Sequence, residues 1–208
     1  MCTKPYTLAC GASYSITALL SPQGKYLVDF FVVNSGGQLL LDLPESLAAD
    51  TLRRLTLYRL RAAVTFAPSD LSVTRGLGPA PADALPDPRH PALGWRAYGA
   101  PGSAPSIDWD AIRVAHCIPE TGIELVPNDS YLLESGFERL QGVDFRKGCY
   151  VGQEVVSRMQ HRGSARTRVV PIVFSAGLNA ESGVEATAGG KTLGRIGSCA
   201  HGRGLALL

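Results

Sequence analysis

The sequence lacks the features that define several protein classes. No uninterrupted apolar segment approaches the ~20 residues that a membrane-spanning helix requires, and the N-terminus has no apolar core typical of a signal peptide. It contains neither a Cys-x-x-Cys pair nor a His-Glu-x-x-His motif, which argues against a zinc ribbon or a thioredoxin-type site. The five cysteines are odd in number and widely spaced. We therefore expect a cytoplasmic protein with reduced thiols, no resident metal ion and no membrane partner.

Positive charge is present but concentrated in one segment. The net charge of the chain is +2, whereas residues 139–168 contain seven Lys or Arg residues against two acidic ones. A local basic patch favours an anionic ligand or partner, although a solvated surface explains a charge run of this size equally well.

The first third of the chain has the pattern of an α+β layer. Turn signals at 21–24 (SPQG) and 34–37 (NSGG) separate β-branched and aromatic runs, which predicts a three-stranded meander over residues 14–42. Asp42 and Glu45 have the spacing of a capping box for a helix that reaches about residue 60. The runs AAVTFAP and LSVTRG favour two further strands.

A proline-rich segment divides the chain. Residues 77–91 hold five prolines without periodicity and are predicted to be a linker or a surface loop. A helix is expected from about Ser106 to before Pro119, followed by an irregular region. From residue 166 onward, short strands with Gly-Gly turns are typical of a small β-barrel. Because the chain stops on an apolar strand that would lack a partner, we expect the barrel to be partial. The predicted parts are 1–76, 77–92, 93–164 and 165–208.

The stretch KGCYVGQEVVSRMQHRG, residues 147–163, places a cysteine just before a short amphipathic helix. Apolar residues share one helical face, Glu154 and Arg158 have i,i+4 spacing, and Gly163 ends the helix. Free backbone N–H groups at the helix start and the nearby Lys147 favour a thiolate at Cys149. The stretch therefore predicts a reactive cysteine, with a small buried apolar residue as the open alternative.

Asp29 is a carboxylate within an otherwise apolar strand. Burying it without a partner would be costly, so it is expected to face a polar cavity or a partner, or else to lie at an edge or turn.

The run KGCYVGQE resembles the sequence motif of the YgfZ family, which comprises folate-binding, iron–sulfur cluster maintenance proteins related to the aminomethyltransferase (T-protein) of glycine cleavage. Flanking runs resemble the same family in the same order, including LLSPQGKYLVDFFVV, DPRHPALGWR, GIELVPNDSYLLESGF and GKTLGRIGSCAHGRGLALL. The resemblance spans about residues 14–208. Compared with the family pattern, the sequence is expected to be shortened at both ends.

The resemblance implies a GcvT-like α+β fold around a folate-binding cavity. It implies a ferredoxin-like antiparallel sheet with helices in 1–76, a second antiparallel α+β module that binds folate in 93–164, and a partial C-terminal β-barrel in 165–208. Folate contacts are expected from Asp29, Tyr150, Gly152, Gln153, Glu154, Arg158, Arg162 and Arg166. Among these, Asp29 is a candidate for the pterin ring, and the three arginines are candidates for the glutamate tail.

The function implied by the resemblance is a tetrahydrofolate-binding accessory protein for assembly or repair of iron–sulfur clusters, of the [4Fe–4S] type. Cys149 would be the functional thiol, kept ionised by Lys147, and the partners would be folate and iron–sulfur client or assembly proteins. The alternative is an enzyme, a folate-dependent one-carbon transferase or demethylase. Aminomethyl transfer itself is disfavoured, because Val28-Asp29 and Arg113-Val114-Ala115 lack the paired aspartates and the glutamate of the T-protein pattern.

A nucleic-acid binder that uses the basic segment is a third hypothesis. Stacking of bases on aromatic side chains supports most single-strand binding, and this segment offers only Phe145 and Tyr150. Nucleic acid is therefore not an expected partner.

Overall fold

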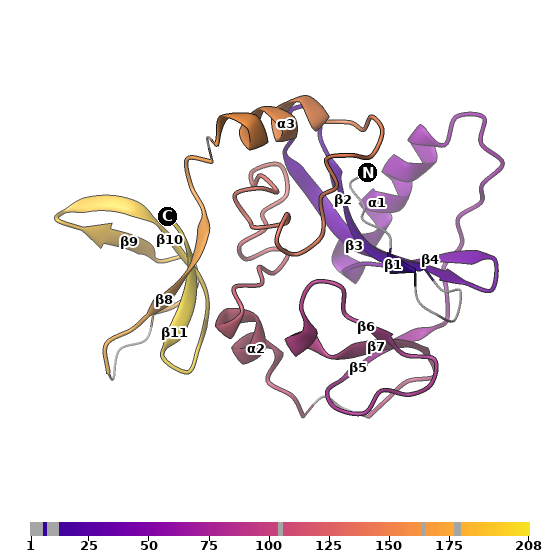
Figure 1. Ribbon diagram of the computed structural model, residues 1–208, viewed down its shortest axis with the longest axis horizontal. Helices are drawn as coiled ribbons and strands as arrows, with labels where there is room; N and C mark the ends of the chain where they lie inside the picture. The colour runs from indigo at the N-terminus through magenta and orange to yellow at the C-terminus, as the bar shows by residue number, and fades with distance from the viewer. Residues whose placement is uncertain (1–5, 8–12, 104–105, 164, 177–179) are drawn as a thin grey trace.

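Three antiparallel sheets and a few helices make up the protein (Figure 1). The computed structural model describes residues 6–7, 13–103, 106–163, 165–176 and 180–208. None of the helices within these ranges is long and apolar enough to cross a membrane. The mixed, antiparallel α/β character expected from the sequence is confirmed.

The first sheet is a meander with strand order β1-β2-β3-β4. The predicted three strands of residues 14–42 are confirmed, and the Ser21–Gly24 turn closes with a hydrogen bond from Gly24 N to Ser21 O of 2.9 Å. Buried and half-buried residues alternate along most of the third strand, as expected of a strand with one face in the core. The strands are β1 (Tyr6–Thr7), β2 (Ser13–Leu20), β3 (Tyr26–Ser35) and β4 (Gln38–Asp42).

Helix α1 (Glu45–Tyr58) follows the first sheet, but the predicted capping box is wrong. Pro44 occupies the N-cap position, and no side chain caps the helix. The carboxylate of Asp42 instead accepts hydrogen bonds from Arg96 and Tyr98. The strand predicted from AAVTFAP does not form either, because residues 62–71 follow α1 without a neighbouring strand to pair with.

The second sheet has the order β5-β7-β6 and takes its edge from the proline-rich segment. Its strands are β5 (Ser72–Gly76), β6 (Leu85–Pro86) and β7 (Trp95–Gly99), with a 3-10 turn η1 (Pro91–Leu93) between the last two. Leu85 and Leu93 are buried, and the side chain of Asp87 is 0% exposed. The expectation of a surface linker over 77–91 is therefore wrong for its second half. A two-residue edge strand tolerates a proline because one side of it needs no hydrogen-bond donor.

The middle of the molecule contains α2 (Trp109–Ala115) and the irregular region that follows it. Asp108, and not Ser106, caps α2, since its carboxylate accepts a hydrogen bond of 2.9 Å from Ala111 N. The larger hydrophobic core joins β2, β3, this region and α3, and consists of Ala18, Leu20, Tyr26, Leu93, Ile118, Leu125, Leu132, Phe137, Leu140, Val143 and Val156.

Helix α3 (Gln153–Arg162) leads into the C-terminal sheet, whose strand order is β8-β11-β10-β9. In Figure 1 this sheet forms its own lobe at one end of the molecule, and it does not close into a barrel. The last strand does not lack a partner, because β11 pairs on both sides and buries Leu205 and Ala206. The strands are β8 (Val169–Val173), β9 (Glu185–Ala188), β10 (Lys191–Ala200) and β11 (Arg203–Leu207).

Candidate functional site

The loop before α3 presents Cys149 to solvent. The helix begins at Gln153, with Gly152 as its N-cap in a left-handed conformation at φ +84°. The side chain of Gln153 accepts a hydrogen bond of 2.9 Å from Tyr150 N, which fixes the loop against the first turn of the helix. Cys149 thus lies three residues before the N-cap, and within the described part of the chain no hydrogen bond joins its thiol to an N–H group of the first helical turn.

Lys147 and Tyr150 flank the cysteine. The Lys147 ammonium lies 4.9 Å from the centre of the Tyr150 ring, a cation–π contact, and Tyr150 packs against the larger hydrophobic core. The tyrosine therefore anchors the short loop that carries the exposed Cys149. A role of Lys147 in the chemistry of this thiol stays a prediction.

The other described cysteines have a different environment. Cys117 and Cys199 are half-buried, and burial raises the pKa of both thiols above the ordinary value. A raised pKa leaves less of the reactive thiolate at neutral pH. Cys2 and Cys10 lie outside the described residues. Cys149 is thus the exposed thiol of the described part of the chain and the candidate reactive group.

The glycines of the motif have separate roles. A Cβ on Gly152 would lie 2.6 Å from Ser21 O and 3.0 Å from Gly24 Cα, so Gly152 lets the β2–β3 turn pack against the start of α3. A Cβ on Gly148 would meet nothing within 4 Å. The group that approaches Gly152 closely is therefore the protein's own backbone. A contact between Gly152 and folate stays a prediction.

The three arginines predicted to hold a folate tail are exposed and belong to α3 and the segment after it. Arg158 forms an ion pair with Glu154 of the same helix, at 2.5 Å between Nη2 and Oε1. Arg162 lies in the last turn, and Arg166 follows the helix. Contacts of Gln153, Glu154 and these arginines with a folate therefore stay predictions.

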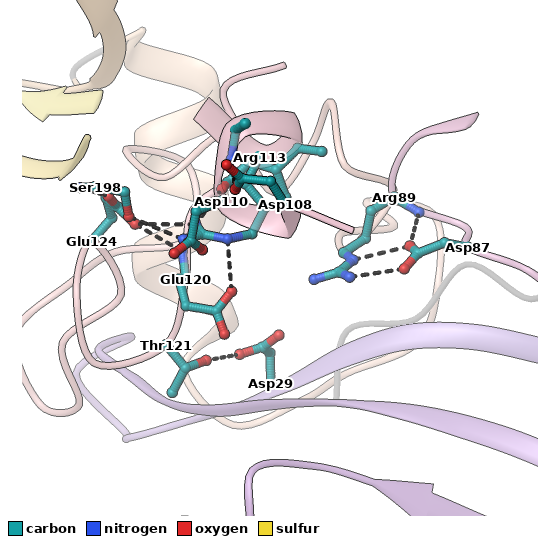
Figure 2. Close-up of polar contacts among 12 residues, drawn as sticks. Asp29, Asp87, Arg89, Asp108, Asp110, Arg113, Glu120, Thr121, Glu124 and Ser198 are labelled. Atoms are coloured by element: carbon teal, nitrogen blue, oxygen red, sulfur yellow. Dashed lines mark hydrogen bonds and ion pairs between the residues drawn. The ribbon is translucent and has the colours of Figure 1, made fainter. Parts of the chain in front are cut away.

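Asp29 is partly buried in β3 and bound by two hydroxyl groups. Its Oδ1 accepts hydrogen bonds from Tyr26 Oη at 2.6 Å and Thr121 Oγ1 at 2.7 Å; Figure 2 shows the second of these. Burial and the Asp29 carboxylate raise the pKa of Tyr26, so the phenol stays protonated and donates. Among the described residues, no hydrogen bond reaches Oδ2 of Asp29. The carboxylate therefore retains acceptor capacity for a further donor.

A buried arginine cluster, defined here as Arg75, Arg89 and Arg96, was missed by sequence reasoning. Asp87 binds Arg89 in a two-pronged pair, with Nε–Oδ1 3.0 Å and Nη2–Oδ2 2.8 Å, which Figure 2 shows. Although burial opposes ionisation, these contacts with Arg89 lower the pKa of Asp87 below its ordinary value. The guanidinium groups of Arg89 and Arg96 lie over the ring of Phe31, at 5.0 and 4.3 Å from its centre.

The signal that could have found this cluster is weak. Asp87 and Arg89 stand two residues apart in a proline-rich run, and Arg75 and Arg96 become neighbours only when β5 and β7 pair. Only the cross-strand register brings these charges together, and a single sequence does not reveal it.

A second buried network joins α2 to the C-terminal sheet (Figure 2). Arg113 Nε lies 3.1 Å from Glu120 Oε2, and Arg113 Nη2 donates to Ser198 Oγ at 3.1 Å. Glu124 accepts hydrogen bonds from Ser198 N at 2.6 Å and Glu120 N at 2.8 Å. These contacts hold β10 against the middle of the molecule, and Arg113 acts there as a structural residue.

No group of three or more His, Cys, Asp or Glu side chains arranged to hold a metal ion occurs within the described ranges.

Comparison with known proteins places this arrangement in a family. The C-terminal sheet belongs to the class of the CAF17 C-terminal β-barrel domain, since the model of that family matches residues 166–208. The human mitochondrial iron–sulfur cluster assembly factor IBA57 is 30% identical over an alignment of 243 positions. The alignment covers 98% of this chain and 68% of the human protein. The chain therefore belongs to the CAF17/IBA57 family.

Two fungal relatives, both named mitochondrial IBA57 homologs, agree with this assignment. The relative from Mycosarcoma maydis is 29% identical over 74% of this chain and 45% of its own length. The relative from Pyricularia oryzae is 30% identical over 76% of this chain and 47% of its own length. The chain thus spans about half the length of these fungal proteins.

Two expectations from the sequence need correction. The YgfZ resemblance is right for the wider group of GcvT-like cluster assembly proteins but too specific, because the relatives are IBA57 proteins. The expected cytoplasmic location is contradicted, because these relatives are mitochondrial proteins by name.

Proposed function

We propose that this protein is an accessory factor in the assembly or repair of iron–sulfur clusters of the [4Fe–4S] type. It binds tetrahydrofolate and uses Cys149 as its functional thiol. Membership in the IBA57 family supports the cluster role, since relatives carry the name of cluster assembly factors. The observation that carries the assignment of the thiol is the exposure of Cys149, whereas Cys117 and Cys199 are half-buried.

The environment of Cys149 suits contact with a macromolecular partner. The thiol stands outside the core on a loop anchored by Tyr150 and Gln153, so a client or assembly protein can reach it without unfolding. A cysteine ligates iron through its sulfur, and an exposed thiol is accessible to the iron of a partner protein. The partners are therefore iron–sulfur client or assembly proteins.

Asp29 supports the folate part of the proposal. Its Oδ1 is held by two hydroxyls while Oδ2 retains acceptor capacity, so the carboxylate is both fixed and available. A pterin ring carries an amino group and a ring N–H that donate side by side to such an acceptor. We expect saturable binding of tetrahydrofolate in a calorimetric titration under reducing, anaerobic conditions.

The thiol is tested in a cell whose own IBA57-type factor has been deleted. The wild-type protein is expected to restore the activity of a [4Fe–4S] enzyme. The Cys149→Ala variant is expected to fail, while its melting temperature stays close to that of the wild type because the side chain is exposed.

The matched control is Cys199→Ala, which removes a half-buried thiol from the C-terminal sheet. This variant is expected to restore enzyme activity whenever it folds. Full rescue by Cys149→Ala would remove the thiol from the function, and loss in both variants alike would point to a general effect of cysteine replacement.

A further inference from the structure

Two members of the buried arginine cluster, Arg89 and Arg96, bind carboxylates through the same edge of the guanidinium group. The Nε and Nη2 atoms of Arg89 bind Asp87. The same two atoms of Arg96 bind Oδ2 of Asp42, at 3.1 and 2.9 Å. These N–H groups form the planar fork that matches a carboxylate.

Arg75 presents this edge without a protein acceptor. Its Nε and Nη2 atoms are both buried, and among the described residues neither finds a hydrogen-bond partner. The face of the guanidinium is covered instead, because Cζ of Arg75 lies 4.0 Å from the centre of the Trp109 ring. Stacking occupies the face of the group and leaves its in-plane N–H donors unsatisfied, and a buried unsatisfied donor is costly.

Charge in the cluster is also unbalanced. Arg75 stands directly opposite Arg96 in the β5–β7 pair, and cross-strand partners point to the same face of a sheet. Three guanidinium groups share two carboxylates, those of Asp42 and Asp87. Burial, Arg96 and Arg89 lower the pKa of Arg75 to about 10, so the group still carries its charge at neutral pH.

We propose that the Nε–Nη2 edge of Arg75 binds a carboxylate of a small ligand, which is the glutamate carboxylate of a tetrahydrofolate. The anion completes the pattern that Asp87 and Asp42 begin, since each arginine of the cluster then holds one carboxylate. The identity of the ligand rests on the proposed folate binding, whereas the carboxylate site rests on Arg75 alone.

The position of Arg89 links this site to Asp29. Arg89 interacts electrostatically with both Asp29 and Arg75. Arg89 thus lies within electrostatic range of both the acceptor at Asp29, proposed for a donor-bearing ring, and the donor edge at Arg75, proposed for a carboxylate. The exposed arginines of α3 are not needed for the first glutamate.

The test is a calorimetric titration of the whole chain with three probes: tetrahydrofolate, a tetrahydropterin that lacks the aminobenzoyl-glutamate tail, and glutarate. Arg75→Gln is expected to lower the affinity for tetrahydrofolate about tenfold to a hundredfold, the usual effect of losing charged hydrogen bonds. The affinity for the tail-less pterin is expected to stay unchanged. Arg75→Lys keeps the charge but loses the fork, and it is expected to recover only part of the loss.

Two controls separate binding from folding. Arg53→Gln removes an exposed charge from α1, outside the proposed site, and is expected to bind tetrahydrofolate as the wild type does. Arg75→Gln removes one of two positive charges, those of Arg75 and Arg96, that face each other across the strand pair. Its melting temperature is therefore expected to be no lower than that of the wild type. Arg75→Lys decides the question if the glutamine variant does not fold.

The outcomes distinguish this inference from the folate proposal. Equal tetrahydrofolate affinity in the wild type and both Arg75 variants, or an equal loss in Arg53→Gln and Arg75→Gln, overturns the site at Arg75. Absence of tetrahydrofolate binding in the wild type overturns the folate proposal. Arg75-dependent binding of glutarate would then keep the carboxylate site with another ligand. Absence of glutarate binding as well would overturn the carboxylate site.

Discussion

The protein has two arginine-rich regions with opposite environments. On α3 and after it, Arg158, Arg162 and Arg166 are exposed, and their charge stands out in the sequence as a basic segment. In the buried arginine cluster, the guanidinium groups lie against Phe31 or Trp109. Arg89 pairs with the nearby Asp87, and Arg96 pairs with Asp42, which is 54 residues away in the sequence. A run of like charges in a sequence thus marks surface, whereas a buried charged site needs opposite charges that the fold brings together.

The largest loss of stability is expected in the buried arginine cluster, from replacement of Asp87. Asp87→Ala leaves Arg89 enclosed without its two-pronged partner and removes a second contact of Arg96. Removing one partner of a buried ion pair costs roughly 3–5 kcal/mol, because the other charge stays desolvated. Chemical denaturation is expected to show this loss in the free energy of unfolding. The control Asp50→Ala removes an exposed ion pair on α1 and is expected to leave the denaturation midpoint almost unchanged; an equal effect of the two variants would contradict the assignment.

The same pair predicts how stability depends on pH. Arg89 holds the pKa of Asp87 below its ordinary value, so in acid the unfolded chain takes up this proton before the folded one does. The contribution of Asp87 is fully present above the ordinary aspartate pKa, about 3.9, and is lost as the pH falls through the lowered value. The difference in unfolding free energy between the wild type and Asp87→Asn is therefore expected to shrink between pH 5 and the acid limit of folding. A difference that does not vary with pH would show that Asp87 acts through shape alone.

A second buried network, that of Arg113 and Glu124, connects the middle of the molecule to the C-terminal sheet. Glu124→Ala leaves Ser198 N and Glu120 N without their acceptor. At about 1–2 kcal/mol for each donor, a total loss of about 2–4 kcal/mol is expected. Hydrogen exchange is expected to speed up in β10 more than in β3, because Glu124 ties β10 to the middle of the molecule. The exposed Glu154→Ala is the control. Uniform acceleration of exchange in both strands would contradict a local tether.

An intermediate loss of stability is expected from replacing a glycine in the motif before α3. Gly152→Ala places a methyl group 2.6 Å from Ser21 O at a φ of +84°, and a loss of about 1–3 kcal/mol is expected. Gly148→Ala meets no neighbour and has no positive φ, so its melting temperature is expected to match that of the wild type. If Gly148→Ala destabilises more than Gly152→Ala, the motif glycines do not have the roles assigned here.

Much of the fold could be predicted from the sequence because local signals determine it. The meander of residues 14–42, α3 and its Gly163 end follow from turn residues and periodicity, and the structure confirms them. The strand predicted at AAVTFAP failed because strand propensity has no effect without a partner strand.

Long-range contacts explain what the sequence could not predict. The proline-rich run was taken for a linker because burial of Asp87 depends on Arg89 and on β7, which lies beyond that run. The position of Cys149 before an amphipathic helix favoured an accessible, reactive thiol, with burial as the alternative. The unsatisfied Nε and Nη2 donors of Arg75, in contrast, follow only from the β5–β7 register.

The smallest loss of stability is expected in the exposed arginine region, from replacement of Arg158. Arg158→Ala breaks a same-helix pair with Glu154 whose two side chains are 55% and 80% exposed, and such pairs contribute about 0.3–0.5 kcal/mol. Thermal melts are therefore expected to coincide within a degree or two at physiological salt. If Arg158 holds the extended tail of a folate, its replacement weakens a polyglutamylated folate more than a monoglutamate. If Arg75 alone holds the carboxylate, both ligands keep their affinities in Arg158→Ala and lose them together in Arg75→Gln. Titrating both folates against both variants thus assigns the first glutamate and the rest of the tail to separate arginine regions, or both to one.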